Sequence, residues 1–179
     1  MENLKSARLS CLLIIFLGLN FQVAQAQWKD ASNLKFVSAP ELKLANLSGK
    51  QINISDYRGK TLLVNFWATW CEPCTEEFEE LIYLQDKYAP KGLVVLAVNL
   101  AEMKPRIQQF LKNNLIKENA IEILQDRNSI VYKSWKARGI PTTFLIDKNG
   151  IIVGSWIGTI ANAESAEFKN KVESLLNKN

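Results

Sequence analysis

Asn65-Phe66-Trp67-Ala68-Thr69-Trp70-Cys71-Glu72-Pro73-Cys74 is the stretch of this chain that decides its fold. An apolar run leads into Trp-Cys-x-x-Cys, with a proline directly before the second cysteine. Two thiols three positions apart at the start of a helix lie one turn apart, so they can close a small disulfide and open it again. A Cys-x-x-Cys beside a strand–helix pattern is typical of redox chemistry. We therefore expect a thiol–disulfide oxidoreductase in which Cys71 and Cys74 react.

Two other uses of the cysteine pair stay open, half of a zinc site and an inert structural disulfide. A four-ligand zinc site needs further donors, usually Cys or His. The chain has no His, and its only other cysteine is Cys11. We therefore predict no metal site, and no cofactor other than the redox-active disulfide Cys71–Cys74.

The first 26 residues have the pattern of a signal peptide. Lys5 and Arg8 supply positive charge, residues 12–19 form an apolar core, and residues 24–26 (Ala-Gln-Ala) form a small-x-small cleavage signal. We expect the mature protein to begin near Gln27 and to work in an oxidising compartment, the bacterial periplasm. The apolar core is short for a membrane span, which needs about 20 residues. An uncleaved inner-membrane anchor facing the periplasm is the alternative.

Composition indicates one domain, placed at residues 36–179 after a linker at 27–35. The chain has 179 residues and a net charge of +4, without a long basic run. Nucleic acid is therefore not an expected partner, and a monomer is expected. Because the chain lacks His, the usual acid–base residue near neutral pH, proton transfer must involve cysteines or carboxylates.

Apolar periodicity predicts a hairpin first, and then strands that alternate with helices. The hairpin covers 40–44 and 51–54, and the apolar segment 61–67 predicts a strand buried on both faces. A helix follows the cysteine pair. Asn149-Gly150 joins two late strands in a second hairpin. The remaining predicted elements are strands at 93–100 and 121–124, strands at 142–146 and 151–156, and helices after Pro105, after Asp126 and around 168–176. This pattern predicts an α/β domain with a mixed sheet.

The order of these elements, with the cysteine pair after the first buried strand and Gly139–Phe144 before the last hairpin, resembles the thioredoxin fold. More narrowly, residues 36–178 are similar to the exported TlpA/ResA/CcmG branch of that superfamily. The N-terminal hairpin and an inserted strand–helix segment at about 100–124 suit this branch. The CcmG group carries Gly-x-Pro-Glu-Thr where this chain has Ile140-Pro141-Thr142-Thr143, so the ResA and TlpA side fits better.

The resemblance implies that Pro141 is a cis-proline facing the cysteine pair, and that the backbone around Ile140 binds an extended substrate chain as an added strand. From the residues alone, a trans proline opening a strand is equally compatible. Thioredoxins carry a buried Asp six residues before the first cysteine, where this chain has Asn65. In ResA-like relatives a Glu six residues after that cysteine takes this role, and here that residue is Glu77. The alternative is that Glu77 is an ordinary acid early in a helix, where the dipole favours acids.

The expected mechanism starts at Cys71, which we place exposed at a helix N-terminus, where the dipole favours the thiolate. Cys71 attacks a substrate disulfide, and Cys74 resolves the mixed disulfide. Pro73 restricts the loop and suits a helix start. Trp70 shields or contacts the site. Glu72 disfavours the Cys71 thiolate, because like charges repel.

The loop between the cysteines contains no cation, which favours a reductant over a strong oxidant. The expected partners are disulfide-containing envelope proteins, for example apocytochrome c or metal-site assembly proteins, and a membrane electron donor. The alternatives are a copper-binding thioredoxin-like chaperone and a disulfide-forming oxidase. The two thiolates suit Cu(I), but the usual third ligand, His, is absent. A peroxidase of the peroxiredoxin type would require Thr-x-x-Cys instead.

Overall fold

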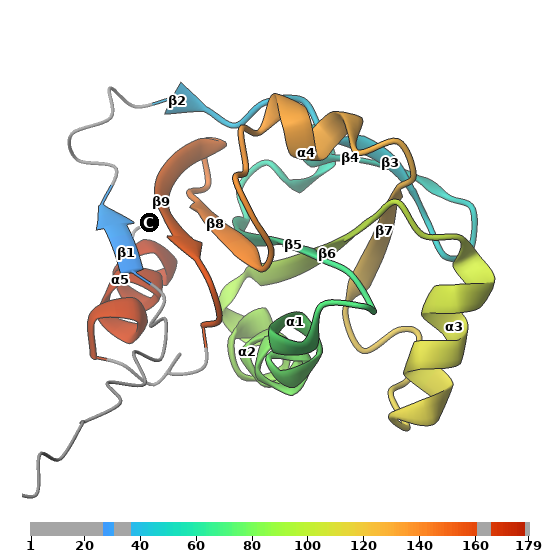
Figure 1. Ribbon diagram of the computed structural model, residues 1–179. Coiled ribbons are helices and arrows are strands. Elements are labelled where there is room, and N and C mark those ends of the chain that lie inside the picture. Colours follow the sequence, from blue (N-terminus) through green and yellow to red (C-terminus); the bar gives the residue numbers. More distant parts are fainter. Residues whose placement is uncertain (1–26, 31–36, 161–165, 178–179) are drawn as a thin grey trace, which may run out of the picture.

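The computed structural model describes residues 27–30, 37–160 and 166–177 (Figure 1). The predicted signal peptide lies outside these ranges. Within them, nine strands form one sheet in the order β1-β9-β8-β5-β6-β7-β3-β4, and β2 pairs with β9. The strands are β1 (Gln27–Asp30), β2 (Val37–Ser38), β3 (Lys43–Asn46), β4 (Gln51–Asn53), β5 (Thr61–Trp67), β6 (Leu93–Leu100), β7 (Glu122–Asp126), β8 (Thr142–Ile146) and β9 (Ile151–Ile157).

The sheet is mixed, as the sequence predicts. Strands β5, β6 and β7 run parallel to one another, and β8 pairs antiparallel with β5. Both predicted hairpins form, β3 with β4 and β8 with β9. The predicted linker at 27–35 begins with β1, which extends the sheet along β9. In the described ranges, no helix is both long and apolar enough to cross a bilayer.

Five α-helices flank the described sheet (Figure 1): α1 (Glu72–Glu76), α2 (Phe78–Tyr88), α3 (Lys104–Asn113), α4 (Ile130–Ser134) and α5 (Ala166–Leu176). Apolar residues of α2, α3 and α5 share one core cluster, and those of α4 belong to a second cluster on the other face. The sequence predicts a single helix after the cysteine pair. The structure instead has two, α1 and α2, because the backbone of Glu77, at φ −81° and ψ −6°, departs from helical geometry between them.

Strand β5 passes through the middle of the molecule with all seven residues buried, as predicted for a strand covered on both faces. Leu62, Val64 and Phe66 point into the cluster with α4, whereas Leu63 and Trp67 point into the cluster with α2. Side chains alternate along a strand, so Asn65 shares the face of Leu63 and Trp67. A polar side chain therefore lies beneath α1 and α2, in an otherwise apolar layer.

Candidate active site

The cysteine pair lies where β5 ends and α1 begins. Cys71 is the N-cap residue of α1, and its carbonyl accepts hydrogen bonds from the amides of Cys74 (3.0 Å) and Thr75 (3.1 Å). The two cysteines are joined in a disulfide with their Cα atoms 5.2 Å apart. Pro73 lies in the first turn of α1, where its missing N–H costs no hydrogen bond. The chain therefore presents the pair as a small ring at a helix N-terminus, as the motif predicts.

Exposure differs from the prediction at one of the two cysteines. The sequence predicts an exposed Cys71, but only 7% of Cys71 is exposed and Cys74 is fully buried. The Cys71 side chain turns inward because its sulfur is bonded to that of Cys74. Trp70, which directly precedes Cys71, is 65% exposed, and Glu72 is also exposed. Trp67 belongs instead to the core, where its ring packs 4.5 Å from that of Phe78 between centroids.

The Ile140–Pro141 peptide bond is cis, as the resemblance implies. Strand register places this bond near the cysteines. Thr142, the first residue of β8, pairs with Phe66, so Pro141 is level with Trp67 at the end of β5 from which the cysteine loop leaves. The Pro141 carbonyl accepts a hydrogen bond from Gly158 (2.8 Å), which ties this segment to the end of β9.

Glu77 is a buried carboxylic acid, and this excludes the alternative of an ordinary surface helix acid. Only 2% of Glu77 is exposed, whereas Glu76 and Glu79 on either side are exposed. Its Oε1 accepts a hydrogen bond from Asn65 Nδ2 at 2.8 Å, and its Oε2 accepts one from the Ile160 amide at 2.8 Å. The break between α1 and α2 thus turns a glutamate inward, onto the polar residue of β5.

Burial raises the pKa of Glu77 from 4.5 to about 7, and the hydrogen bonds from Ile160 and Asn65 act in the opposite direction. Desolvation is the largest cause, because burial removes the bulk water that would stabilise the charged form. A carboxyl group with this pKa gains and loses its proton near neutral pH.

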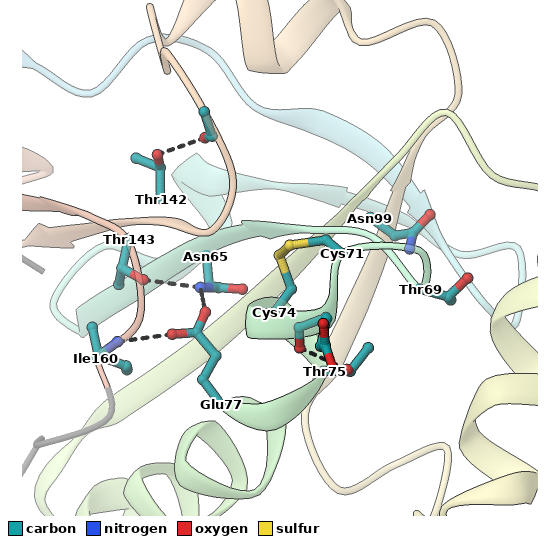
Figure 2. The surroundings of a disulfide bond; sticks show 12 residues. Asn65, Thr69, Cys71, Cys74, Thr75, Glu77, Asn99, Thr142, Thr143 and Ile160 are labelled. Carbon is teal, nitrogen blue, oxygen red and sulfur yellow. Dashed lines mark hydrogen bonds between the residues drawn. A yellow bond between two sulfur atoms is a disulfide. The ribbon is translucent and has the colours of Figure 1, made fainter. Parts of the chain in front are cut away.

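Asn65 connects this carboxyl group to the rest of the site. Its Nδ2 uses both hydrogens, one toward Glu77 and one toward Thr143 Oγ1 at 2.9 Å. Its Oδ1 is buried and has no hydrogen-bond partner among the described residues. Figure 2 shows the amide nitrogen turned toward Glu77 and Thr143 and the oxygen turned toward the disulfide. Asn65 cannot exchange a proton as an Asp would, but it holds the residue that can.

A second buried acid, Glu102, binds the loop that precedes Cys71. Glu102 follows β6, is 8% exposed, and accepts hydrogen bonds from the amide and the hydroxyl group of Thr69. The sequence predicts no role for Glu102, Thr69 or Thr143. Nothing in the local sequence marks them, because each acts through a partner from another strand or loop.

The comparisons with known proteins agree with this geometry. The model of the AhpC/TSA family matches residues 37–155. The chain belongs to the AhpC/TSA family. The thiol-disulfide oxidoreductase ResA of Geobacillus thermodenitrificans is 32% identical over 165 residues, which cover 92% of this chain and 91% of that protein. ResA of Bacillus subtilis is 29% identical over 167 residues, covering 93% and 92%.

A solved structure is similar over the whole domain. The thiol:disulfide interchange protein DsbE from Chlorobium tepidum matches with a TM-score of 0.71 and 29% identity, and the match covers 80% of this chain and 98% of that one. The thioredoxin-like fold is therefore confirmed. Together with the ResA relatives, this match identifies the chain as a thiol–disulfide oxidoreductase of the ResA-like type.

Proposed function

We propose that this protein is an exported reductant of protein disulfides that works in the periplasm. The observation that carries the proposal is a buried, protonatable Glu77 behind a Cys-Glu-Pro-Cys pair whose loop contains no cation. Strong oxidants of this fold owe their potential to a stabilised thiolate in the reduced form. A carboxyl group beside the thiols works against the thiolate, which lowers the reduction potential of the pair and makes it a better reductant.

The reaction transfers two electrons to the substrate. The Cys71 and Cys74 thiols each release one proton, the first to water and the second to Glu77 and from there to water, and the two substrate sulfurs take up two protons from water. The Cys71 thiolate attacks one sulfur of a substrate disulfide, the substrate S–S bond breaks, and the first substrate sulfur leaves as a thiolate that takes a proton. Cys74 then loses its proton and attacks the Cys71 sulfur, so that the second substrate sulfur leaves and is protonated. We assign Glu77, with a pKa of about 7, as the group that receives the Cys74 proton.

Substrate recognition is assigned to the rim of the site. The backbone at Ile140 and Pro141 pairs with an extended segment of the substrate, and the exposed Trp70 contacts the same segment from the other side of the cysteines. The substrates are disulfide-containing envelope proteins, for example apocytochrome c or metal-site assembly proteins. A membrane thiol donor restores the dithiol, and no cofactor beyond the Cys71–Cys74 pair takes part. The signal peptide is cleaved before Gln27 during export, and the mature protein is a monomer.

The redox state of the pair in intact cells tests the direction of electron flow. Thiols are trapped with a maleimide of large mass after acid quenching, and the expected result is that most of the mature protein carries two labels. An equilibrium titration with glutathione should give a potential nearer the thioredoxin value of about −270 mV than the DsbA value of about −120 mV. A fully oxidised pair in cells, with a potential near that of DsbA, would make the protein a disulfide-forming oxidase. N-terminal sequencing of envelope protein that recovers Met1 would favour the membrane anchor.

A further inference from the structure

Glu102 accepts three hydrogen bonds at the side of the disulfide that lies away from Glu77. Its Oε2 accepts from the Thr69 amide at 2.7 Å and from Asn99 Nδ2 at 2.8 Å, and its Oε1 accepts from the Thr69 hydroxyl group at 2.6 Å. Figure 2 shows Thr69 and Asn99 on this side of the pair, and Glu77 on the other. Both carboxylate oxygens are thus used to hold one residue, two positions before Cys71.

Arg106 contacts both Thr69 and Glu102 from the solvent side. Its Nε donates to Thr69 Oγ1 at 3.1 Å and lies 3.9 Å from Glu102 Oε1. The Glu102 side chain is 7% exposed and that of Arg106 is 65% exposed. Hydrogen bonds that a carboxylate accepts are stronger than those between neutral groups, and bonds from both the backbone and the side chain of Thr69 fix its orientation. Thr69 is therefore held at its amide and at its hydroxyl group.

We propose that Glu102 is a positioning residue for the reaction, which fixes the Thr69-Trp70-Cys71 segment so that protein substrates meet Trp70 and Cys71 in one arrangement. The segment leaves the sheet at Trp67 and enters α1 at Glu72, and α1 has only five residues, so the short helix gives it limited support. The hydrogen bonds between Thr69 and Glu102 attach this segment to the turn after β6. Trp70, which is 65% exposed, has little packing of its own to hold its position.

The proposal rests on the dithiol chemistry of the pair, but not on the direction of electron flow proposed above. Glu102→Gln keeps the size of the side chain and replaces one acceptor oxygen by an NH₂ group, which cannot accept from Thr69. We expect the reduced variant to react with insulin, a protein disulfide, about 10-fold more slowly, because a docked substrate disulfide that lies about 1 Å out of line with Cys71 can lose up to about 100-fold in rate. Reaction with the small disulfide dithiobis(nitrobenzoic acid), which needs no docking, should change by less than about 2-fold.

Three further variants separate positioning from folding. Thr69→Ser keeps both hydrogen bonds to Glu102 and should reduce insulin at the parent rate. Thr69→Val removes the hydrogen bond of the hydroxyl group and should slow insulin reduction. The double variant Glu102→Gln/Thr69→Val should be no slower than the slower single variant, since both act through one contact. Glu41→Gln, at an exposed glutamate, is the matched control and should behave as the parent.

Amide hydrogen exchange of the full chain gives a readout that needs no substrate. In Glu102→Gln, exchange at residues 69–71 should rise about 10-fold or more, while exchange in β5 stays unchanged. Equal slowing with insulin and with the small disulfide, or unchanged rates with both, would overturn the positioning role. A pair that is oxidised in cells would contradict the proposed reducing function and leave these rate ratios as they are.

Discussion

Replacing Glu77 by Gln should remove a large pH-dependent component from the stability of the oxidised protein. The pKa of Glu77 is raised from 4.5 to about 7 by burial. Between these two pH values, the folded protein keeps the proton while the unfolded chain has released it. Stability therefore falls as pH rises through this interval, and the loss is complete above pH 7.

The size of the effect follows from the shift. A difference of about 2.5 pKa units corresponds to about 3 kcal/mol, at about 1.4 kcal/mol per unit. The free energy of unfolding of Glu77→Gln minus that of the parent should thus increase by about 3 kcal/mol from pH 4 to pH 8. The amide also offers one acceptor oxygen where the carboxylate accepts bonds from Asn65 and Ile160. These bonds favour the charged form, so their effect on ionisation is already contained in the pKa of about 7. The remaining difference, between Gln and the protonated acid, does not depend on pH, so it offsets the difference curve without changing its slope.

Urea denaturation of the oxidised proteins at half-unit steps of pH measures this difference. With the disulfide intact, the cysteines do not titrate and contribute nothing to the slope. Glu79→Gln, at an exposed position of α2, is the control and should run parallel to the parent at all pH values. If the Glu77→Gln and parent curves are also parallel, Glu77 is ionised at its ordinary pH, and its assignment as a proton acceptor near pH 7 fails.

The other predictions concern the same site and its core. Asn65→Ala removes a hydrogen bond that lowers the pKa of Glu77, so the pH-dependent fall in stability should extend to higher pH than in the parent, measured by the same denaturation series. Cys74→Ser should accumulate mixed disulfides with envelope proteins on non-reducing gels, and Cys71→Ser should not; the opposite pattern would reverse the two roles. Phe78→Ala should cost about 3–5 kcal/mol at pH 7, because the ring is fully buried against other aromatic rings; a loss below about 1 kcal/mol would contradict this packing.

The elements that sequence predicts well are those with a local signal. Strand β6 has the predicted bounds 93–100, and the Asn149-Gly150 turn forms the predicted hairpin. Both depend on residues that are close in sequence, the first on an unbroken apolar run and the second on a turn that needs a positive φ, which Gly150 has at 78°. The cysteine pair and its place before a helix are predicted for the same reason.

The burial of Glu77 could not be predicted from its neighbours. Glu72, Glu76, Glu77 and Glu79 are alike in the sequence, and only Glu77 among them is buried. The cause lies elsewhere in the chain, because its partners Asn65 and Ile160 are 12 and 83 residues away. The resemblance to ResA-like proteins pointed to this residue, whereas helix periodicity did not. The break between α1 and α2, which lets the side chain turn inward, also has no signal such as Pro or Gly at this position.

Sheet order explains why the remaining site residues converge on the cysteine pair. Strands β5 and β6 are parallel, and Trp67 is level with Asn99. The chain therefore leaves both strands at the same end of the sheet, where Thr69 binds Glu102. Strand β8 runs in the opposite direction and begins at this end of the sheet, so the Ile140–Pro141 segment lies near the end of β5. Ligands of open α/β sheets bind outside the carboxyl ends of the parallel strands. The motif supplies the sulfurs, and the topology determines which acids, amides and backbone groups surround them. A relative that keeps Cys-x-x-Cys but changes the residues after β6 should therefore keep the dithiol and lose the contacts of Glu102 with Thr69.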